Sequence, residues 1–262
     1  MSNDLIKRNA ELHDRIASVY DDIHSEIFND VEQRRLSTTL RRALSYVQST
    51  AAKPRAFDFG CGTGNLTRHL IEMGVDVVAG DVSQKCLQIV VNKFGVKTFL
   101  LNGNDLSEID SETFDFVACY SVLHHIPDYM KAIYELGRIC KNGGIVYIDH
   151  EPTDEYWIFS EQYSRFRKCA EKINYRKFLH LSNYFNKFRR MINSRYTNEG
   201  DIHVWPDDHV EWDHIINLFC KTSFRIVIDE KFLLCRANYR SDVFEYFKNN
   251  IADTRAMAFK KF

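Results

Sequence analysis

The sequence predicts an α/β fold in which a doubly wound, mostly parallel sheet carries helices on both faces. Three observations lead to this class. Short apolar runs alternate with helical patterns through the first half of the chain, as in successive βαβ units. A turn with alternating glycines, Gly60, Gly62 and Gly64, follows the first apolar run. Two apolar runs near the end, joined by almost no connector, predict an antiparallel closing pair and a total of seven strands.

The composition is that of an ordinary globular protein. The chain has 262 residues, of which 45% are apolar and 27% charged, enough for one large domain with an elaboration. No apolar run approaches the roughly 20 residues of a membrane span, and the N-terminus lacks a signal-peptide core. The seven cysteines are scattered and never spaced as C-x-x-C, which favours reduced thiols over disulfides or zinc. We therefore expect a cytoplasmic protein.

The elements are expected in a regular order along the chain. Apolar residues at helical spacing predict two N-terminal helices over 10–28 and 30–48. Lys53-Pro54 separates them from the first strand, which ends at the glycine turn. The later strands are expected at 75–81, 96–101, 114–119, 144–149, 224–229 and 232–237, with helices at 66–73, 127–140 and 208–221.

This order suggests a division of the chain. Residues 1–50 are expected to form helices that cover the ligand site, and residues 51–152 and 200–240 to form the sheet domain. Residues 153–199 lack strand alternation and are interpreted as a basic and aromatic helical insertion that acts as a lid. Residues 241–262 are expected to form a C-terminal helix or tail.

The glycine turn indicates a nucleotide-like ligand at the carboxyl end of the first strand. Its spacing is G-x-G-x-G, and Asn65 stands where the third glycine of a dinucleotide motif would be. Asp81 ends the second strand and can accept hydrogen bonds from ribose hydroxyls. Asn104 and Asp105 follow the third strand, where an adenine edge would lie.

Five ordered motifs resemble those of the class I S-adenosylmethionine-dependent methyltransferases. The resemblance covers about residues 10 to 150 and implies a Rossmann-like fold and S-adenosylmethionine as the cofactor. The motifs are Asp58-x-Gly60-Cys61-Gly62-Thr63-Gly64, Gly80-Asp81-Val82-Ser83, Asn104-Asp105-Leu106, Phe114-Asp115-x-Val117 leading into Ser121-Val122-Leu123-His124-His125-Ile126-Pro127-Asp128, and Lys141-x-Gly143-Gly144.

The resemblance implies a set of cofactor-binding residues. The glycine turn would cradle the methionine part, Asp81 the ribose, and the residues after the second and third strands the adenine. Tyr120 and Ser121 would lie near the sulfonium, and Tyr20 would belong to a segment that folds over the cofactor. Asp105 could instead cap a helix, and Tyr20 could be plain helix packing. The implied set is Tyr20, Asp58, Gly60, Cys61, Gly62, Gly64, Asp81, Val82, Asn104, Asp105, Leu106, Tyr120 and Ser121.

Two neighbouring histidines are the candidates for catalysis. His124 and His125 follow the fourth strand, and a neutral imidazole can remove the proton of an acceptor hydroxyl near pH 7. Leu-His-His-Ile-Pro-Asp is similar to the pattern of sugar and other small-molecule O-methyltransferases. Asp149-His150-Glu151-Pro152 closes the fifth strand at the same edge, so an acid there, with Asp149 as the candidate for catalysis, could orient a histidine or bind a sugar hydroxyl. His203 lies in a segment that resembles one lining the acceptor pocket. Adjacent residues of a strand alternate faces, so residues 149–151 are not expected to converge on a metal ion.

The stretch from 165 to 195 holds ten Lys or Arg and a single acid, in a chain of net charge −1. It could be an amphipathic lid with its charges in water, a site for an anionic acceptor, or a contact with an anionic membrane surface. The predicted function is methyl transfer to a small-molecule or saccharide-like acceptor, most simply on oxygen. The alternatives are an RNA or lipid-linked-substrate methyltransferase, a cofactor-binding protein without transferase activity, and an NAD(P)-dependent oxidoreductase. No RNA-binding module is visible, so nucleic acid is not the expected partner.

Overall fold

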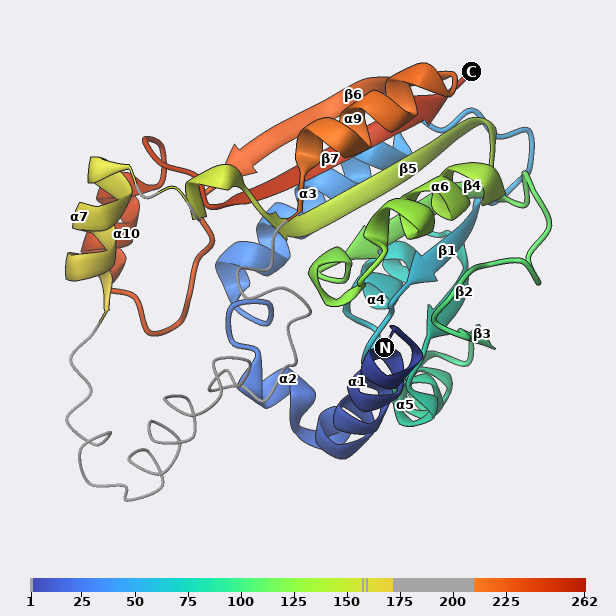
Figure 1. Ribbon diagram of the computed structural model, residues 1–262, viewed down its shortest axis with the longest axis horizontal. Helices are drawn as coiled ribbons and strands as arrows, with labels where there is room; N and C mark the ends of the chain where they lie inside the picture. The colour runs from blue at the N-terminus through green and yellow to red at the C-terminus, as the bar shows by residue number, and fades with distance from the viewer. Residues whose placement is uncertain (1, 157, 159, 172–209) are drawn as a thin grey trace.

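The computed structural model describes residues 2–156, 158, 160–171 and 210–262, and these form a seven-stranded sheet flanked by helices (Figure 1). The strands are β1 (Arg55–Phe59), β2 (Asp76–Asp81), β3 (Lys97–Leu100), β4 (Phe114–Tyr120), β5 (Cys140–Pro152), β6 (Phe224–Phe232) and β7 (Thr254–Lys261). The helices are α1 (Ser2–Ile16), α2 (Tyr20–Ile23), α3 (Asp30–Leu44), α4 (Asn65–Glu72), α5 (Gln84–Phe94), α6 (Tyr129–Ile139), α7 (Glu161–Ala170), α9 (Trp212–Lys221) and α10 (Ser241–Phe247), with short 3-10 turns η1 (Ala17–Val19), η2 (Leu123–His125) and η3 (Asp154–Tyr156).

The strand order is β3-β2-β1-β4-β5-β7-β6. The first five strands of the chain pair in parallel, whereas β7 lies antiparallel between β5 and β6. Chain order reverses at β1, whose neighbours are β2 on one side and β4 on the other. In open α/β sheets this reversal leaves a crevice at the carboxyl ends of the strands. The predicted fold class is confirmed, with β7 as its antiparallel closing strand.

Helices cover both faces because successive side chains of each strand point to opposite sides. On one face Phe57 and Val117 pack with α6 and α9, in a core that includes Leu136 and Phe219. On the other face, Phe116 and its neighbours pack against α3 and α4. Helix α5 covers the same second face beside β2. The sheet is therefore buried on both sides, and its polar ends are the exposed places left for a ligand.

The C-terminal prediction was wrong in its boundaries. Residues 224–232 form one long strand, β6, and its antiparallel partner is Thr254–Lys261 rather than 232–237. Residues 241–262 accordingly contain both a short helix, α10, and the closing strand of the sheet. The pattern was missed because β7 is built from Ala, Met, Phe, Arg and Lys after Thr254, with few of the β-branched residues that mark a strand.

The N-terminal helices also differ from the prediction. The expected helix over 10–28 is broken, because α1 ends at Ile16 and is followed by η1 and the four-residue α2. The second helix, α3, begins at Asp30, where Asn29 accepts hydrogen bonds from Val31 N and Glu32 N. The break turns the chain toward the glycine turn, where Asp21 accepts a hydrogen bond from Thr63 Oγ1 at 2.5 Å.

Beyond the ends of β6 and β7, α7 and α10 pack side by side (Figure 1). Tyr163 and Phe166 of α7 are buried against Tyr239 and Phe244, and Arg240 N donates to Ala170 O at 2.7 Å. The first part of the predicted 153–199 insertion is thus helical, as expected. The remainder of the insertion and His203 lie outside the described residues. Within the described part of the chain, no helix combines the length and apolar character needed to cross a bilayer.

The buried position of β7 gives a stability test. Phe259 is fully buried against Phe219, with ring centroids 4.5 Å apart, whereas Phe262 at the strand's end is 55% exposed. We expect Phe259→Ala to lower the free energy of unfolding by about 3–5 kcal/mol because it leaves a cavity in the core. Phe262→Ala, the matched control, should change it by less than about 1 kcal/mol. Urea denaturation followed by circular dichroism measures both, and equal losses would contradict the placement of β7.

Candidate active site

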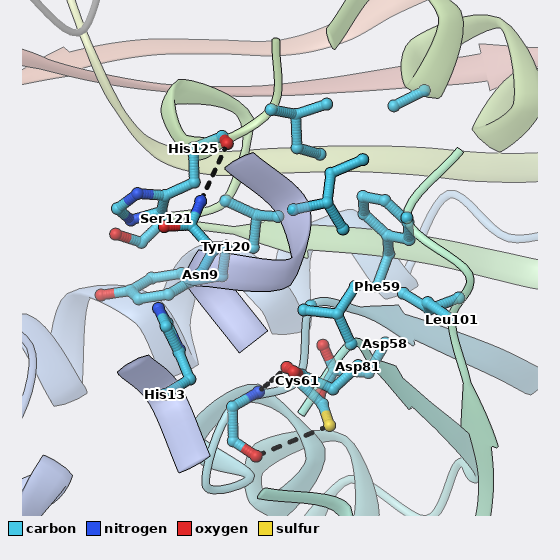
Figure 2. Close-up of a pocket in the computed structure, with 18 of the residues that line it drawn as sticks. Asn9, His13, Asp58, Phe59, Cys61, Asp81, Leu101, Tyr120, Ser121 and His125 are labelled. Atoms are coloured by element: carbon cyan, nitrogen blue, oxygen red, sulfur yellow. Dashed lines mark hydrogen bonds between the residues drawn. The ribbon is translucent and has the colours of Figure 1, made fainter. Parts of the chain in front are cut away.

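A pocket opens at the carboxyl ends of β1, β2 and β4, where the sheet order reverses (Figure 2). Its floor is the glycine turn after β1, and its far wall is the segment after β4. Helix α1 covers it with Ile6, Asn9 and His13, which recur at helical spacing along one face. Figure 2 shows Asn9 beside the chain at His125, where its Nδ2 donates to His125 O at 3.4 Å.

Main-chain hydrogen bonds shape the glycine turn. Gly60 N and Cys61 N both donate to Gly80 O, at 2.8 and 2.9 Å, which ties the end of β1 to β2. Gly60 has φ +72°, and a Cβ at this position would lie 2.5 Å from Val122 Cγ2. Only glycine meets both conditions without strain. At Gly60 the turn therefore brings main chain without a side chain to the pocket floor.

Asp81 connects this turn to the end of β2. Its carboxylate accepts hydrogen bonds from Gly62 N and Ser83 N, each at 2.8 Å. The side chain is buried, and burial raises its pKa, while hydrogen bonds from Ser83 and the charge of His13 act in the opposite direction. A buried carboxylate at the mouth of a nucleotide-like pocket is suited to accept hydrogen bonds from vicinal hydroxyls of a ligand.

Asp58, in the middle of the motif, supports the turn from behind. It lines the innermost part of the pocket and accepts a hydrogen bond from Thr67 Oγ1 of α4. Burial raises the pKa of Asp58 to about 7, aided by the neighbouring Asp81 charge and opposed by the Thr67 hydrogen bond.

The residues predicted to contact adenine line the pocket together, where the chain leaves β2 and β3. Val82, Asn104, Asp105 and Leu106 all line it. Leu106 N donates to Glu135 Oε2 of α6 at 3.2 Å, and Arg138 holds Glu135 in turn. Asp105 caps no helix; its carboxylate accepts from Ser107 and Asn102, which lowers its pKa to about 2. These contacts fix the loop that follows β3.

The segment after β4 forms the wall nearest the expected methyl group. Tyr120 and Ser121 line the pocket, and Ser121 has φ +59°. Ser121 N donates to Asp149 O at 3.0 Å, which joins the ends of β4 and β5. A non-glycine residue with positive φ is strained and is retained where the surroundings over-determine it.

Glu151 holds this strained segment. Its fully buried carboxylate accepts hydrogen bonds from Val122 N and Leu123 N, each at 2.7 Å. The second carboxylate oxygen lies 2.8 Å from His124 Nδ1. One acid from β5 thus fixes both the main chain of the wall and the orientation of the His124 ring. Nothing in the local sequence marks Glu151 for this role, because its partners are 27 to 29 residues away.

The two candidate histidines have different surroundings. His125 lines the pocket, and its ring lies edge-on to His13 at 6.0 Å. His124 is not among the lining residues; its ring contacts His125 at 4.1 Å and faces the β5 side, where Glu151 lies. The predicted interaction of an acid from the 149–151 stretch with a histidine is thus made by Glu151.

Asp149 is placed away from the pocket. It is fully buried and accepts from Arg35 Nη1 at 3.1 Å, from His150 N at 2.6 Å and from the Tyr147 hydroxyl. Because Arg35 belongs to α3, its hydrogen bond to Asp149 binds this helix to the end of β5. Glu32 of the same helix pairs with Arg35 at 2.8 Å. Gly64 is also outside the pocket: it precedes α4 with φ +93°, and a Cβ there would lie 2.6 Å from Phe94.

Sequence reasoning missed the contacts that hold the N-terminal segment over the pocket. Asp14 of α1 accepts from Ser83 Oγ at 2.6 Å and Lys85 N at 3.1 Å, and Asp21 pairs with Lys93 at 3.0 Å. Tyr20, which was predicted, lines the pocket from this segment. The 3–4 spacing of Ile6, Asn9 and His13 could have identified the face of α1, but not what the face covers.

The fold and pocket define an α/β domain for a nucleotide-like cofactor, and comparisons with known proteins agree. Residues 57–148 match the family model described as a methyltransferase domain. An uncharacterized methyltransferase of Geobacillus thermodenitrificans is 30% identical over 56% of this chain and 65% of its own length. A ubiquinone biosynthesis O-methyltransferase of Alkalilimnicola ehrlichii is 31% identical over 35% of this chain and 39% of its own length. The matched stretch therefore spans less than two thirds of either relative.

Solved structures show the same fold at low identity. A Haloferax volcanii methyltransferase, in complex with the Trm112 methyltransferase activator, is similar over 95% of this chain and 96% of its own, with TM-score 0.57 and 14% identity. An S-adenosylmethionine-dependent methyltransferase of Mesorhizobium loti covers 91% and 99%, with TM-score 0.55 and 16% identity. The matched domain and the shared fold support a class I S-adenosylmethionine-dependent methyltransferase, with S-adenosylmethionine as the cofactor.

The residues present fit this cofactor. Gly60 and Gly62 present main chain without a side chain at these two positions of the pocket floor, Asp81 offers acceptors for ribose hydroxyls, and Val82 and Leu106 offer apolar contact for a purine. Among the described residues no cluster of His, Cys, Asp and Glu has the arrangement of a metal site.

A pair of glycine substitutions tests the pocket floor. Gly60 and Gly74 both have positive φ, but an added Cβ meets Val122 only at Gly60 and meets nothing within 4 Å at Gly74. We expect Gly60→Ala to weaken S-adenosylhomocysteine binding at least tenfold, which is about 1.4 kcal/mol, because Val122 must shift into the pocket. Gly74→Ala should lose about 1 kcal/mol of stability from backbone strain and bind normally. Calorimetric titration of both variants with S-adenosylhomocysteine measures the two affinities. Equal losses of affinity would show that the ligand does not bind at the turn that contains Gly60.

The raised pKa of Asp58 predicts a pH dependence of stability. Between about pH 4, the ordinary aspartate value, and pH 7, the folded protein holds a proton here that the unfolded chain has released. Stability should therefore fall as the pH rises through this window. In Asp58→Asn, which has no such proton, the fall should be smaller. Urea denaturation at several pH values from 4.5 to 7.5, an interval set by that linkage, compares the two proteins. Parallel profiles would show that Asp58 does not titrate there.

Proposed function

We propose that this protein transfers the methyl group of S-adenosylmethionine to an oxygen of a small-molecule or saccharide-like acceptor. The observation that carries the proposal is the His124–Glu151 contact behind the pocket wall. A carboxylate that accepts a hydrogen bond from the Nδ1–H of a histidine fixes the tautomer in which Nε2 carries the lone pair and can take a proton. Such a pair is suited to an acceptor that must lose a proton as it reacts, as a hydroxyl must.

The cofactor supplies a methyl group on a sulfonium, which is a good leaving group for an in-line displacement. The protein then has to align the acceptor and manage its proton. Tyr120 and Ser121 form the wall beside the expected acceptor position, and Glu151 fixes the main chain of that wall. In this proposal His124 receives the acceptor's proton, and Glu151 stabilises the positive charge that the imidazole gains.

His125 and Asp149 receive different roles from those first considered. His125 lines the cofactor side of the pocket and holds α1 through its carbonyl oxygen, so we assign it to binding. Asp149 is engaged by Arg35 and Tyr147, so we assign it to fastening α3 to the sheet. The remaining predicted residues that line the pocket are proposed to contact the cofactor, with Gly64 as a conformational requirement of the turn.

The relatives support methylation of oxygen. The Alkalilimnicola ehrlichii protein, which is similar over 35% of this chain, is a ubiquinone biosynthesis O-methyltransferase. Helix α7, at the start of the basic stretch, buries Tyr163 and Phe166 and exposes Arg165 and Lys168. This supports an amphipathic segment whose charges face water. The proposal of an acceptor that carries negative charge rests instead on the ten Lys or Arg between 165 and 195.

The proposed acceptor chemistry is tested directly. The protein is first titrated with S-adenosylhomocysteine, and is then assayed with methyl-labelled S-adenosylmethionine on a panel of phenols, catechols, saccharides, sugar phosphates and amines. We expect binding in the first experiment and labelled methyl ethers in the second. Labelling confined to the amines would overturn the proposal of oxygen as the accepting atom.

The His124–Glu151 pair gives a sharper prediction. On the acceptor found in that panel, His124→Gln should lower the turnover rate by about 10²- to 10⁴-fold, the usual contribution of a general base. Glu151→Gln should also be slow, because an amide N–H cannot accept from the ring nitrogen. Both variants should still bind S-adenosylhomocysteine. His214→Gln, at an exposed histidine on α9, serves as the control. Undiminished turnover in His124→Gln would remove it from the catalytic step.

A further inference from the structure

His150 occupies a strained position beside the pocket that the proposed mechanism does not use. It has φ +60°, in the region that non-glycine residues rarely adopt. The pairing of β5 with β7 shifts register between Ile148 and Glu151, so His150 lies in a bulge of β5. Bulges next to sites turn a side chain away from its regular direction, and strain of this kind is retained where it serves the site.

The bulge places the His150 ring against Tyr120. The two rings stack with centroids 4.9 Å apart and 26° between their planes. Tyr120 is itself one of the residues that line the pocket, at the end of β4. The stacked pair therefore joins the ends of two strands at the side of the pocket where the acceptor must approach.

Both rings carry a buried polar atom with no hydrogen-bond partner in the described parts of the chain. These atoms are Tyr120 Oη and His150 Nε2, and the two residues are only 7% and 8% exposed. Buried polar atoms are nearly always hydrogen-bonded, so two such atoms on stacked rings are best explained by a ligand.

The chemistry of the two atoms differs. In the tautomer with the proton on Nδ1, the His150 ring carries its lone pair on Nε2 and can accept a hydrogen bond there. Burial and the positive charges of Arg35, His124 and Arg236 lower the pKa of His150 well below its usual value, so the ring stays neutral. Tyr120 is un-ionised, since burial raises its pKa well above the ordinary value, and Oη can donate.

We propose that Tyr120 Oη and His150 Nε2 together bind a neutral hydroxyl group of the acceptor, which donates to the imidazole and accepts from the phenol. This inference rests on the proposed methyltransferase function and specifies its substrate class. A methylene at the same place would leave both atoms unpaired, and an ether would leave His150 Nε2 unpaired, so the pair selects hydroxyl-bearing acceptors. His150 is here a specificity residue, because a nitrogen with so low a pKa is a poor proton acceptor for catalysis.

The tautomer can be tested without any acceptor. The full chain is labelled with ¹⁵N-histidine and saturated with S-adenosylhomocysteine, and His150 is assigned by its loss in His150→Gln. We expect Nε2 to be unprotonated at neutral pH. An Nε2 that carries the proton would overturn the proposal.

A matched pair of probes then tests the site. Phenol and its methyl ether, anisole, differ in the hydroxyl alone and are titrated into the same complex. We expect phenol to shift the His150 Nε2 resonance and anisole to leave it unchanged. Tyr120→Phe should weaken phenol binding about fivefold, the effect of one lost hydrogen bond. Tyr134→Phe, at a 57% exposed tyrosine of α6, should have no effect.

Absence of phenol binding, an equal shift with anisole, or unchanged phenol affinity in Tyr120→Phe would each overturn the inference. The S-adenosylhomocysteine titration made beforehand separates this failure from that of the proposed function. A protein that binds S-adenosylhomocysteine but does not distinguish phenol from anisole keeps its methyltransferase assignment and loses the hydroxyl site. A protein that does not bind S-adenosylhomocysteine loses the proposed function itself.

Discussion

The hydrogen bond from Gly62 N to the buried Asp81 carboxylate is the contact on which the pocket depends. It joins the turn after β1 to the end of β2, beside the reversal of strand order. Burial of the carboxylate is unfavourable unless main-chain N–H groups compensate it, and Gly62 and Ser83 do so. The turn must therefore keep the conformation that presents the Gly62 N–H to Asp81. That conformation also places the main chain of Gly60 and Gly62 at the pocket floor, so folding and cofactor binding make the same demand on this turn.

Glu151 is a second buried carboxylate that main-chain N–H groups compensate, on the β4 side of the point where the strand order reverses. Glu151 accepts two main-chain N–H groups from the segment after β4 and contacts His124. The segment carries strain at Ser121, and the facing strand carries strain at His150. Hydrogen bonds to a buried carboxylate are strong enough to offset strain of this size. The segment after β4 is thus held in place by β5, while the glycine turn is held in place by β2.

The parts of this arrangement that were predictable are those encoded locally. Alternating apolar runs gave the parallel sheet, and the glycine spacing with Asp81 gave the cofactor, because each feature lies within one strand-turn-helix unit. Glu151 and Arg35 could not be found in this way, since their partners are distant in sequence and depend on which strands become neighbours. β7 was missed for another reason: Ala256 and Ala258 suit a fully covered central strand, but alanine is no indicator of a strand. His13 was not recognised as a pocket residue because the sequence does not show that α1 packs over the pocket.

The electrostatic environments of His124 and His150 suggest a division of labour between proton transfer and recognition. His124 Nδ1 lies 2.8 Å from a carboxylate oxygen of Glu151, whose charge would stabilise an imidazolium in the proposed proton transfer. His150 lies near Arg35 and Arg236, whose charges oppose protonation. Pairs of titratable groups whose environments differ in this way are how one site assigns separate roles to the same residue type. Both environments follow from the end of β5, where Glu151 contacts the segment after β4 and the bulge places His150 against Tyr120. This strand end therefore determines the proposed roles of both histidines.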